Sequence, residues 1–172
     1  YAQDDPAAFT LYPPDWSLSP APSTGARNRL YREAVVPLAE EAARKALDES
    51  GRAPEEVTHL VFVSCTGFFT PGPDILLVKN LGLPATTQRT IVGFMGCYAA
   101  FNALRVAEGF VRSDPAAVVL VVCAELCTLH FQTTGTFEEA VVNSLFADGC
   151  AAAVLSGEAR AGTLALEGTA TV

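Results

Sequence analysis

The run of residues 117–123 constrains the fold of this chain more than any other segment. Its sequence, Ala-Val-Val-Leu-Val-Val-Cys, is apolar without exception. A short and continuously apolar run is typical of a strand in a parallel sheet, because helices cover both faces of such a sheet and neither side of the strand meets water. The run therefore predicts an α/β fold in which this strand is covered on both faces.

Helical and strand-like patterns alternate along the chain. Apolar side chains at three-to-four spacing predict helices over residues 26–50, 74–81, 98–113 and 138–146. Gly51 and Gly82 are expected to end the first two, and Pro37 either kinks the first helix or begins another one. Strands are predicted over residues 58–64, 90–93, 117–123, 150–155 and 162–169, with a Thr-rich loop over 125–137. This order predicts right-handed βαβ units and a mixed, mainly parallel sheet flanked by helices.

The chain is expected to hold one folded domain preceded by an irregular segment. Residues 1–25 contain closely spaced prolines, which interrupt regular elements: Pro6, Pro13, Pro14, Pro20 and Pro22. Residues 26–172 carry the alternating pattern and suit a single α/β domain in length and in apolar content.

Charge and hydropathy exclude some classes of partner. The chain has 19 acidic and 11 basic residues, for a net charge of -8, and its Lys and Arg residues do not gather into a stripe. This distribution argues against nucleic acid as a partner. Because no apolar run has the length of a membrane span and no leader pattern opens the chain, we expect a soluble, cytoplasmic protein that does not enter a membrane.

The five cysteines indicate reduced thiols. They form an odd set without C-x-x-C pairs, whereas a disulfide framework normally needs an even number. Cys123, Cys127 and His130 follow a C-x3-C-x2-H spacing that could bind zinc. No fourth ligand stands at a supporting distance in the sequence, so we expect no metal site.

Cys97 is the candidate nucleophile. In the run Thr90-Ile-Val-Gly-Phe-Met-Gly-Cys-Tyr-Ala-Ala100, an apolar strand meets a turn with glycines, and a helical pattern begins directly behind the thiol. Enzymes use this order of strand, tight turn, nucleophile and helix to expose an attacking atom at a sheet edge. Unpaired N–H groups and the helix dipole favour thiolate at such a position. Taken alone, the pattern is also compatible with an ordinary buried cysteine.

Four segments together resemble the type III polyketide synthases, the family of chalcone synthase-like enzymes. Residues 65–74 are similar to the family's strand-exit loop, and residues 96–100 to its nucleophile turn. Residues 123–131 are similar to its pocket-lining segment, and residues 145–152 to a Gly-Asp-Gly turn in which Ala147 replaces the first glycine. The order and spacing of the four segments also match the family. Cys127 with His130 is more similar to the bacterial members than to the plant members. The resemblance covers roughly residues 26–170.

The resemblance implies a thiolase-like fold and a defined chemistry. In this family a cysteine accepts a starter acyl group from coenzyme A, and the enolate formed by decarboxylation of malonyl-CoA then attacks the thioester. Cys97 would be that cysteine, which attacks thioesters readily. The substrates would be coenzyme A thioesters, with no further cofactor. Cys65, Thr66, Cys127 and His130 would line the acyl cavity, and Thr70 would reach the pocket of a second subunit in a homodimer.

The chain also departs from the family pattern. The family's activating His and Asn belong to its second half, its first strand lies upstream, and its coenzyme A phosphates bind to upstream basic residues. We therefore expect the chain to be an amino-terminal half of the duplicated fold that is inactive alone. His59 is expected to be structural, Asn102 and Asn143 do not match the family's Asn, and Asp148 is expected to bond its own backbone in a tight turn. Glu125 would need a hydrogen-bonding partner if it is buried.

Other interpretations remain open from the sequence. A ketoacyl synthase III-like enzyme and a hydroxymethylglutaryl-CoA synthase-like enzyme share the fold, but the Cys-Thr-Gly and Glu-Leu-Cys-Thr-Leu-His segments favour the polyketide synthases. An alternative of another class is a non-catalytic module that folds or dimerises without turnover.

Overall fold

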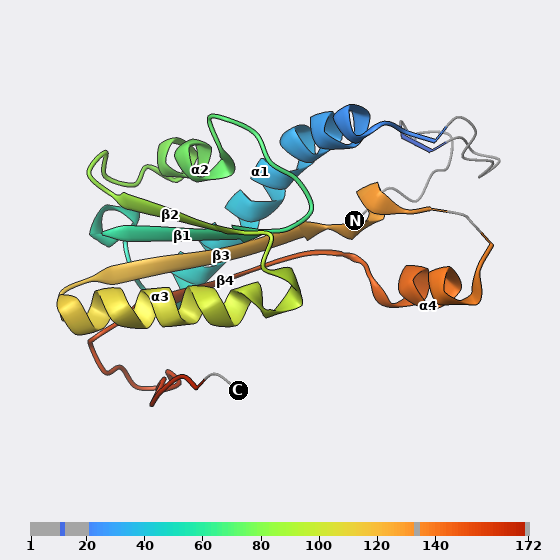
Figure 1. Ribbon diagram of the computed structural model, residues 1–172. Coiled ribbons are helices and arrows are strands. Elements are labelled where there is room, and N and C mark those ends of the chain that lie inside the picture. Colours follow the sequence, from blue (N-terminus) through green and yellow to red (C-terminus); the bar gives the residue numbers. More distant parts are fainter. Residues whose placement is uncertain (1–10, 13–20, 133–134, 171–172) are drawn as a thin grey trace.

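The computed structural model describes residues 11–12, 21–132 and 135–170. They form a four-stranded sheet in the order β2-β1-β3-β4, built from β1 (His59–Ser64), β2 (Gln88–Gly93), β3 (Val118–Leu126) and β4 (Asp148–Ser156). The first three strands are mutually parallel, and β4 runs antiparallel to β3. Helices α1 (Thr24–Ser50) and α2 (Pro73–Leu81) cover one face, and α3 (Ala99–Ser113) covers the other (Figure 1). The predicted mixed, mainly parallel sheet flanked by helices is confirmed.

Helix α1 is continuous through Pro37. It begins slightly before the predicted start, at Thr24, where the Ser23 hydroxyl accepts a hydrogen bond from the Ala26 N–H at 3.2 Å. Gly51 ends it in a left-handed conformation, as predicted. A proline inside a helix removes one backbone hydrogen bond, but the residues around Pro37 are held in the core, and this packing keeps the helix in one piece.

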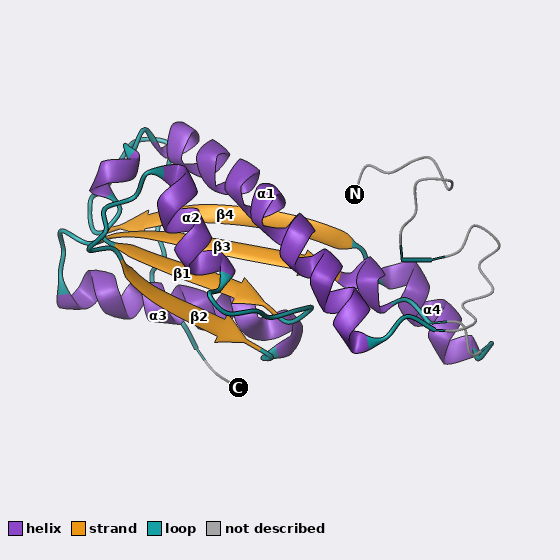
Figure 2. Ribbon diagram, turned by 90° about the horizontal axis from the view of Figure 1, so that it is seen from above, coloured by secondary structure: helices purple, strands orange, loops and turns teal. Residues whose placement is uncertain are grey.

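Two apolar layers fill the space between the helices and the sheet. Alternate residues of each strand point to opposite faces, so Leu60 and Phe62 of β1 face α1 and α2, whereas Val61 and Val63 face α3. The inward side of α3 consists of small residues one turn apart: Ala99, Ala103 and Ala107. These alanines let α3 lie close against the sheet, and Figure 2 shows the helix passing behind the strands, on the face opposite α1 and α2.

Two predictions around β3 and β4 are wrong. The segment expected to be a loop from residue 125 instead continues β3, because Glu125 and Leu126 pair with Gly149 and Asp148 of β4. Asp148 and Gly149 consequently belong to a strand and form no tight turn. Helix α4 (Phe137–Leu145) lies close to its predicted range. It stands away from the sheet (Figure 1, Figure 2).

The predicted last strand over residues 162–169 is absent from the described part of the chain. After β4 the backbone packs against the turn that precedes β3, where a Cβ atom on Gly157 would lie 2.7 Å from the Pro115 carbonyl oxygen. The tail then reaches α3, and the Thr169 hydroxyl donates to Glu108 at 3.0 Å. This course takes the tail away from the sheet edge that a further strand would need.

Two further expectations bear on the ends of the chain and on membranes. The predicted irregular segment falls mostly on residues 1–10 and 13–20, which lie outside the described residues. Among the described helices, none has both the length and the apolar character needed to cross a bilayer.

Candidate active site

Three loops that follow parallel strands meet at one edge of the sheet. They are the first loop (Cys65–Thr70) after β1, the nucleophile turn (Phe94–Cys97) after β2, and the third loop (Cys127–Phe131) after β3. Parallel strands bring their carboxyl ends to the same edge, which is where α/β proteins place their binding sites. All the predicted site residues, from Cys65 to His130, therefore lie on the loops of this one edge.

Cys97 is exposed in the nucleophile turn. It occupies a 3₁₀ turn, Gly96–Tyr98, that leads directly into α3. Gly96 has φ 70°, and the space around it is open, so it is this backbone conformation that calls for glycine. Phe94 also has a positive φ, 57°, which is uncommon for a bulky residue. The predicted arrangement of strand, tight turn, thiol and helix is confirmed.

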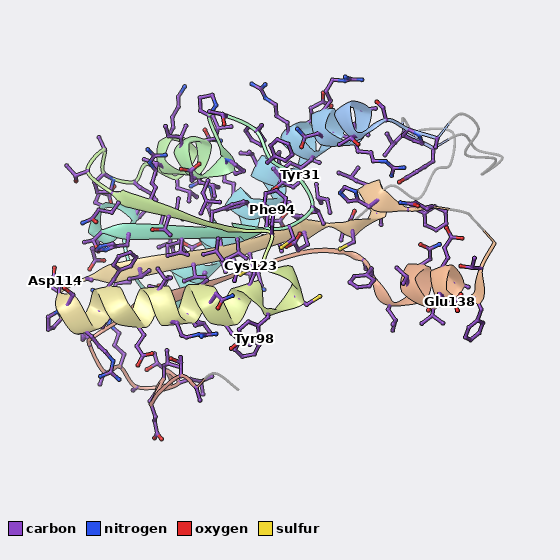
Figure 3. All side chains as sticks on the ribbon, viewed as in Figure 1. Tyr31, Phe94, Tyr98, Asp114, Cys123 and Glu138 are labelled. Atoms are coloured by element: carbon purple, nitrogen blue, oxygen red, sulfur yellow. The ribbon has the colours of Figure 1, made fainter. Side chains whose placement is uncertain are left out.

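The first loop touches the nucleophile turn. The Cys65 thiol donates a weak hydrogen bond to the Gly96 carbonyl oxygen, with 3.8 Å between sulfur and oxygen. The Phe68 and Phe94 rings lie edge to face with their centroids 6.1 Å apart. Figure 3 shows Phe94 and Tyr98 at this end of the sheet and Asp114 at the opposite end.

Glu125 ties the first loop to β3. Its carboxylate accepts hydrogen bonds from the Cys65 N–H at 2.8 and 3.0 Å and from the Thr66 hydroxyl at 2.8 Å. The same hydroxyl accepts from the Leu126 N–H at 2.9 Å. Glu125 thus has the partners that its position requires, and Thr66 links the first loop to β3. Whether Cys65 and Thr66 also line an acyl cavity stays a prediction.

The third loop is held by contacts from two other segments. Asp148 accepts from the Thr128 N–H at 2.8 Å and from its hydroxyl at 2.7 Å, and not from its own backbone as predicted. His130 Nε2 lies 2.7 Å from the Thr66 carbonyl oxygen. A carbonyl oxygen only accepts, so this nitrogen carries a proton and donates it. The contact favours the predicted pocket-lining role of His130 over proton abstraction at Nε2.

The thiols differ in their surroundings. Burial, together with the charges of Glu125 and Asp148 and the nearby Cys97, raises the pKa of Cys127. Burial also raises the pKa of Cys123 and brings that of Cys150 to about 12. These three groups therefore stay protonated near neutral pH, as weak nucleophiles.

His59 lies far from the candidate site. It begins β1 and is thus at the amino end of the parallel strands, where its ring stacks on Phe110 with 4.2 Å between centroids. Its Nδ1 is 2.8 Å from the Thr58 hydroxyl. Burial lowers the pKa of His59, against the opposing charge of Asp114. These contacts fit the structural role expected from the sequence.

Three further predictions concern Thr70, a metal site and Asn143. Thr70 is exposed at the end of the first loop, before α2. Within the described residues, no three His, Cys, Asp or Glu side chains gather closely enough to hold a metal ion. The Asn143 side chain donates to the Gln132 carbonyl oxygen at 3.0 Å and so ties α4 to the end of the third loop.

Sequence reasoning missed the contribution of α1. The Asn28 amide donates to the Phe68 carbonyl oxygen at 2.6 Å and accepts from the Phe68 N–H at 2.9 Å. Arg27 donates to the Leu129 carbonyl oxygen, and to the Tyr12 hydroxyl at 2.9 Å. Both residues precede the apolar repeat of α1, where polar side chains carry no periodic signal. No local pattern could have identified their partners.

Comparisons with known proteins extend this picture. Residues 12–159 match the family model of chalcone and stilbene synthases, N-terminal domain. Over 129 residues the chain is 43% identical to the alpha-pyrone synthesis polyketide synthase-like protein Pks18 of Mycobacterium tuberculosis, an alignment that covers 75% of this chain and 33% of the relative. It is 41% identical over 141 residues to bisdemethoxycurcumin synthase of Oryza sativa, covering 81% of this chain and 35% of that protein.

A solved structure agrees with both relatives. The 1,3,6,8-tetrahydroxynaphthalene synthase of Streptomyces coelicolor, a bacterial type III polyketide synthase, aligns with a TM-score of 0.76 at 31% identity, over 80% of this chain and 40% of that one. The chain spans about a third of the length of the curated relatives that it matches.

Proposed function

The chain belongs to the family of chalcone and stilbene synthases, the type III polyketide synthases, and we propose from this premise that it carries the acyl-accepting thiol of a polyketide-forming acyltransferase. Its mixed sheet flanked by helices is the thiolase-like architecture of that family. The proposed reaction condenses a starter acyl-CoA with malonyl-CoA by decarboxylative Claisen chemistry. The match over residues 12–159 favours this reaction over those of ketoacyl synthase III-like and hydroxymethylglutaryl-CoA synthase-like enzymes.

The exposed thiol of Cys97 is the observation that carries the proposal. It stands in a tight turn between a parallel strand and a helix, at the edge where three loops meet. As thiolate, Cys97 attacks the acyl-CoA carbonyl carbon, the bond from that carbon to the coenzyme A sulfur breaks, and coenzyme A leaves. Backbone N–H groups at the start of α3 are proposed to stabilise the oxyanion.

The second step releases the thiol. Malonyl-CoA loses carbon dioxide, and the resulting enolate attacks the thioester carbonyl carbon. The bond to the Cys97 sulfur then breaks, which leaves a chain extended by two carbons on coenzyme A. Cys65, Thr66, Cys127 and His130 are proposed to surround the acyl group, since their loops flank the nucleophile turn. No metal or redox cofactor takes part in the proposed chemistry.

The assembly and the location of the protein belong to the same proposal. The exposed position of Thr70, at the end of the first loop, suits a residue that reaches a second subunit of a homodimer. A cytoplasmic location suits the five free cysteines, because thiols stay reduced there.

Mass spectrometry of the intact protein tests the proposed acyl transfer. The protein is incubated with medium- and long-chain acyl-CoA, in parallel with Cys97→Ser and with Cys123→Ser as the matched control. An increase by the mass of the acyl group is expected in the wild type and in Cys123→Ser, and is expected to be lost in Cys97→Ser. Equal loading of the two variants would refute Cys97 as the nucleophile. Absence of any adduct on folded wild-type protein would refute acyl transfer by this chain alone, and would mean that Cys97 depends on the His and Asn that the family carries in its second half.

A further inference from the structure

The amino-terminal end of α1 reaches the first loop through two hydrogen bonds of Asn28. The Asn28 side-chain amide meets the backbone of Phe68 as a neighbouring strand would, donating to its carbonyl oxygen at 2.6 Å and accepting from its N–H at 2.9 Å. Two hydrogen bonds from one planar group fix the position and the rotation of the Phe68 peptide groups together. The backbone of Phe68 is therefore set by a residue that lies forty positions earlier.

Other contacts fix the first half of this loop, residues 65–67. Glu125 holds the Cys65 N–H and the Thr66 hydroxyl, and Gly67 lies flat against the Tyr31 ring. In the second half of the loop, the Asn28 side chain forms the hydrogen bonds to the backbone of Phe68. The loop is thus anchored to β3 on one side and to α1 on the other.

The side chain of Phe68 connects the first loop to the nucleophile turn. Phe68 is 63% exposed, and its ring lies edge to face with that of Phe94, which is 69% exposed. Phe94 belongs to the turn that bears Cys97, and its left-handed backbone depends on neighbouring contacts to keep it in place. These two exposed rings, one on the first loop and one in the turn that bears the exposed Cys97, form an apolar rim, and an acyl chain bound there would remove apolar surface from water.

We propose that Asn28 is a positioning residue for acyl selection: it holds Phe68 against Phe94, and the rim of these two rings sets the preference of Cys97 for long apolar acyl groups. The proposal rests on the proposed acyl transfer. Asn28 touches neither the thiol nor the substrate, and it acts through the backbone of Phe68. Short acyl groups, which end before the rim, are expected to load independently of Asn28.

The test uses the full-length protein and compares acylation rates for two chain lengths. Rates with lauroyl-CoA and acetyl-CoA are measured by intact mass for the wild type, Asn28→Ala, Asn28→Asp and the control Asn80→Ala, together with the melting temperature of each. The control removes an amide that also joins α1 to another element, since Asn80 donates to Glu40 at 3.1 Å. Asn28→Asp keeps an acceptor for the Phe68 N–H but has no donor for its carbonyl oxygen.

In Asn28→Ala, the ratio of the lauroyl rate to the acetyl rate is expected to fall by about tenfold, because small misplacements near a reacting group cost this much or more. Asn28→Asp should lose less, and Asn80→Ala should keep the wild-type ratio. An unchanged ratio in Asn28→Ala would overturn the inference. So would an equal loss of both rates with a lower melting temperature, which would indicate a merely structural role.

The wild type distinguishes this failure from that of the proposed function. If the wild type and Asn80→Ala accept no acyl group, the proposed acyl transfer is refuted, and the role of Asn28 in acyl selection is refuted with it. If both accept acyl groups and Asn28→Ala keeps their ratio, only the role of Asn28 is refuted.

Discussion

Replacing Gly67 with alanine should destabilise the protein through one contact. A Cβ atom on Gly67 would lie 2.2 Å from Cγ of Tyr31, and 2.4 and 2.5 Å from its two Cδ atoms. Tyr31 is completely buried, and because protein interiors are close-packed, its ring has little room into which it could retreat. Gly67 does not have a left-handed backbone, and alanine would therefore suffer from the contact and not from its own conformation.

The expected magnitude follows from the geometry. Reaching an ordinary contact of about 3.5 Å would require the ring or the loop to move by more than about 1 Å. Overpacking of a core typically costs about 1–3 kcal/mol, and a buried ring near backbone belongs at the upper end. Alanine recovers about 0.4–1 kcal/mol by restricting the unfolded chain. The net loss in the free energy of unfolding should therefore be about 2 kcal/mol.

Urea unfolding of the purified protein, followed by circular dichroism, measures this loss. The matched control is Gly109→Ala in α3, where a Cβ atom would meet nothing within 4 Å. That change should stabilise the protein by about 0.5–1 kcal/mol, because glycine weakens a helix interior. The same substitution thus has opposite expected signs at the two positions. A Gly67→Ala variant as stable as the wild type would refute the tight packing of the first loop on α1.

Two further predictions concern titratable groups. Burial lowers the pKa of His59, so the unfolded state binds its proton first. The stabilising contribution of the neutral ring is complete above the unfolded pKa of about 6.5 and is lost as the pH falls from there through the lower pKa of the folded state. The free energy of unfolding of His59→Gln should therefore depend less on pH than that of the wild type between about pH 7.5 and pH 5.5. An identical slope would contradict this assignment. In alkylation with iodoacetamide near pH 8, the exposed Cys97 should react well before the half-buried Cys150, whose pKa of about 12 leaves almost no thiolate. Equal rates in peptide mass mapping would contradict this prediction.

Local signals predicted the elements well where the element itself contains the cause. Gly51 and Gly82 end their helices in left-handed conformations, as glycine permits. The continuous apolar run before Cys123 became a strand covered on both faces, and the turn at Cys97 formed where glycine allows it. In each case the residues that cause the structure are adjacent in the sequence.

Prediction failed where the cause lies in a distant segment. Residues 162–169 have a strand-like composition, but Gly157 packs against Pro115 and directs the tail toward α3. Asp148 was expected to bond its own backbone, whereas the third loop offers Thr128 as a better-placed donor. For Glu125 the sequence indicated that a partner was needed but could not indicate which one, because Cys65 lies sixty positions away.

A double-mutant cycle between Gly67 and Tyr31 shows which of these distant contacts sets the first loop. Tyr31→Leu removes ring atoms that a methyl group on residue 67 would strike, although it destabilises the protein by itself because the ring is fully buried. In that background Gly67→Ala should cost less than in the wild type, with a coupling energy of about 1–2 kcal/mol. Such coupling means that the Tyr31 ring is the obstacle, and that α1 determines where the loop lies beside Cys97. Costs that add within about 0.5 kcal/mol would mean instead that the loop moves away from the ring, and that the Tyr31 ring does not decide its position.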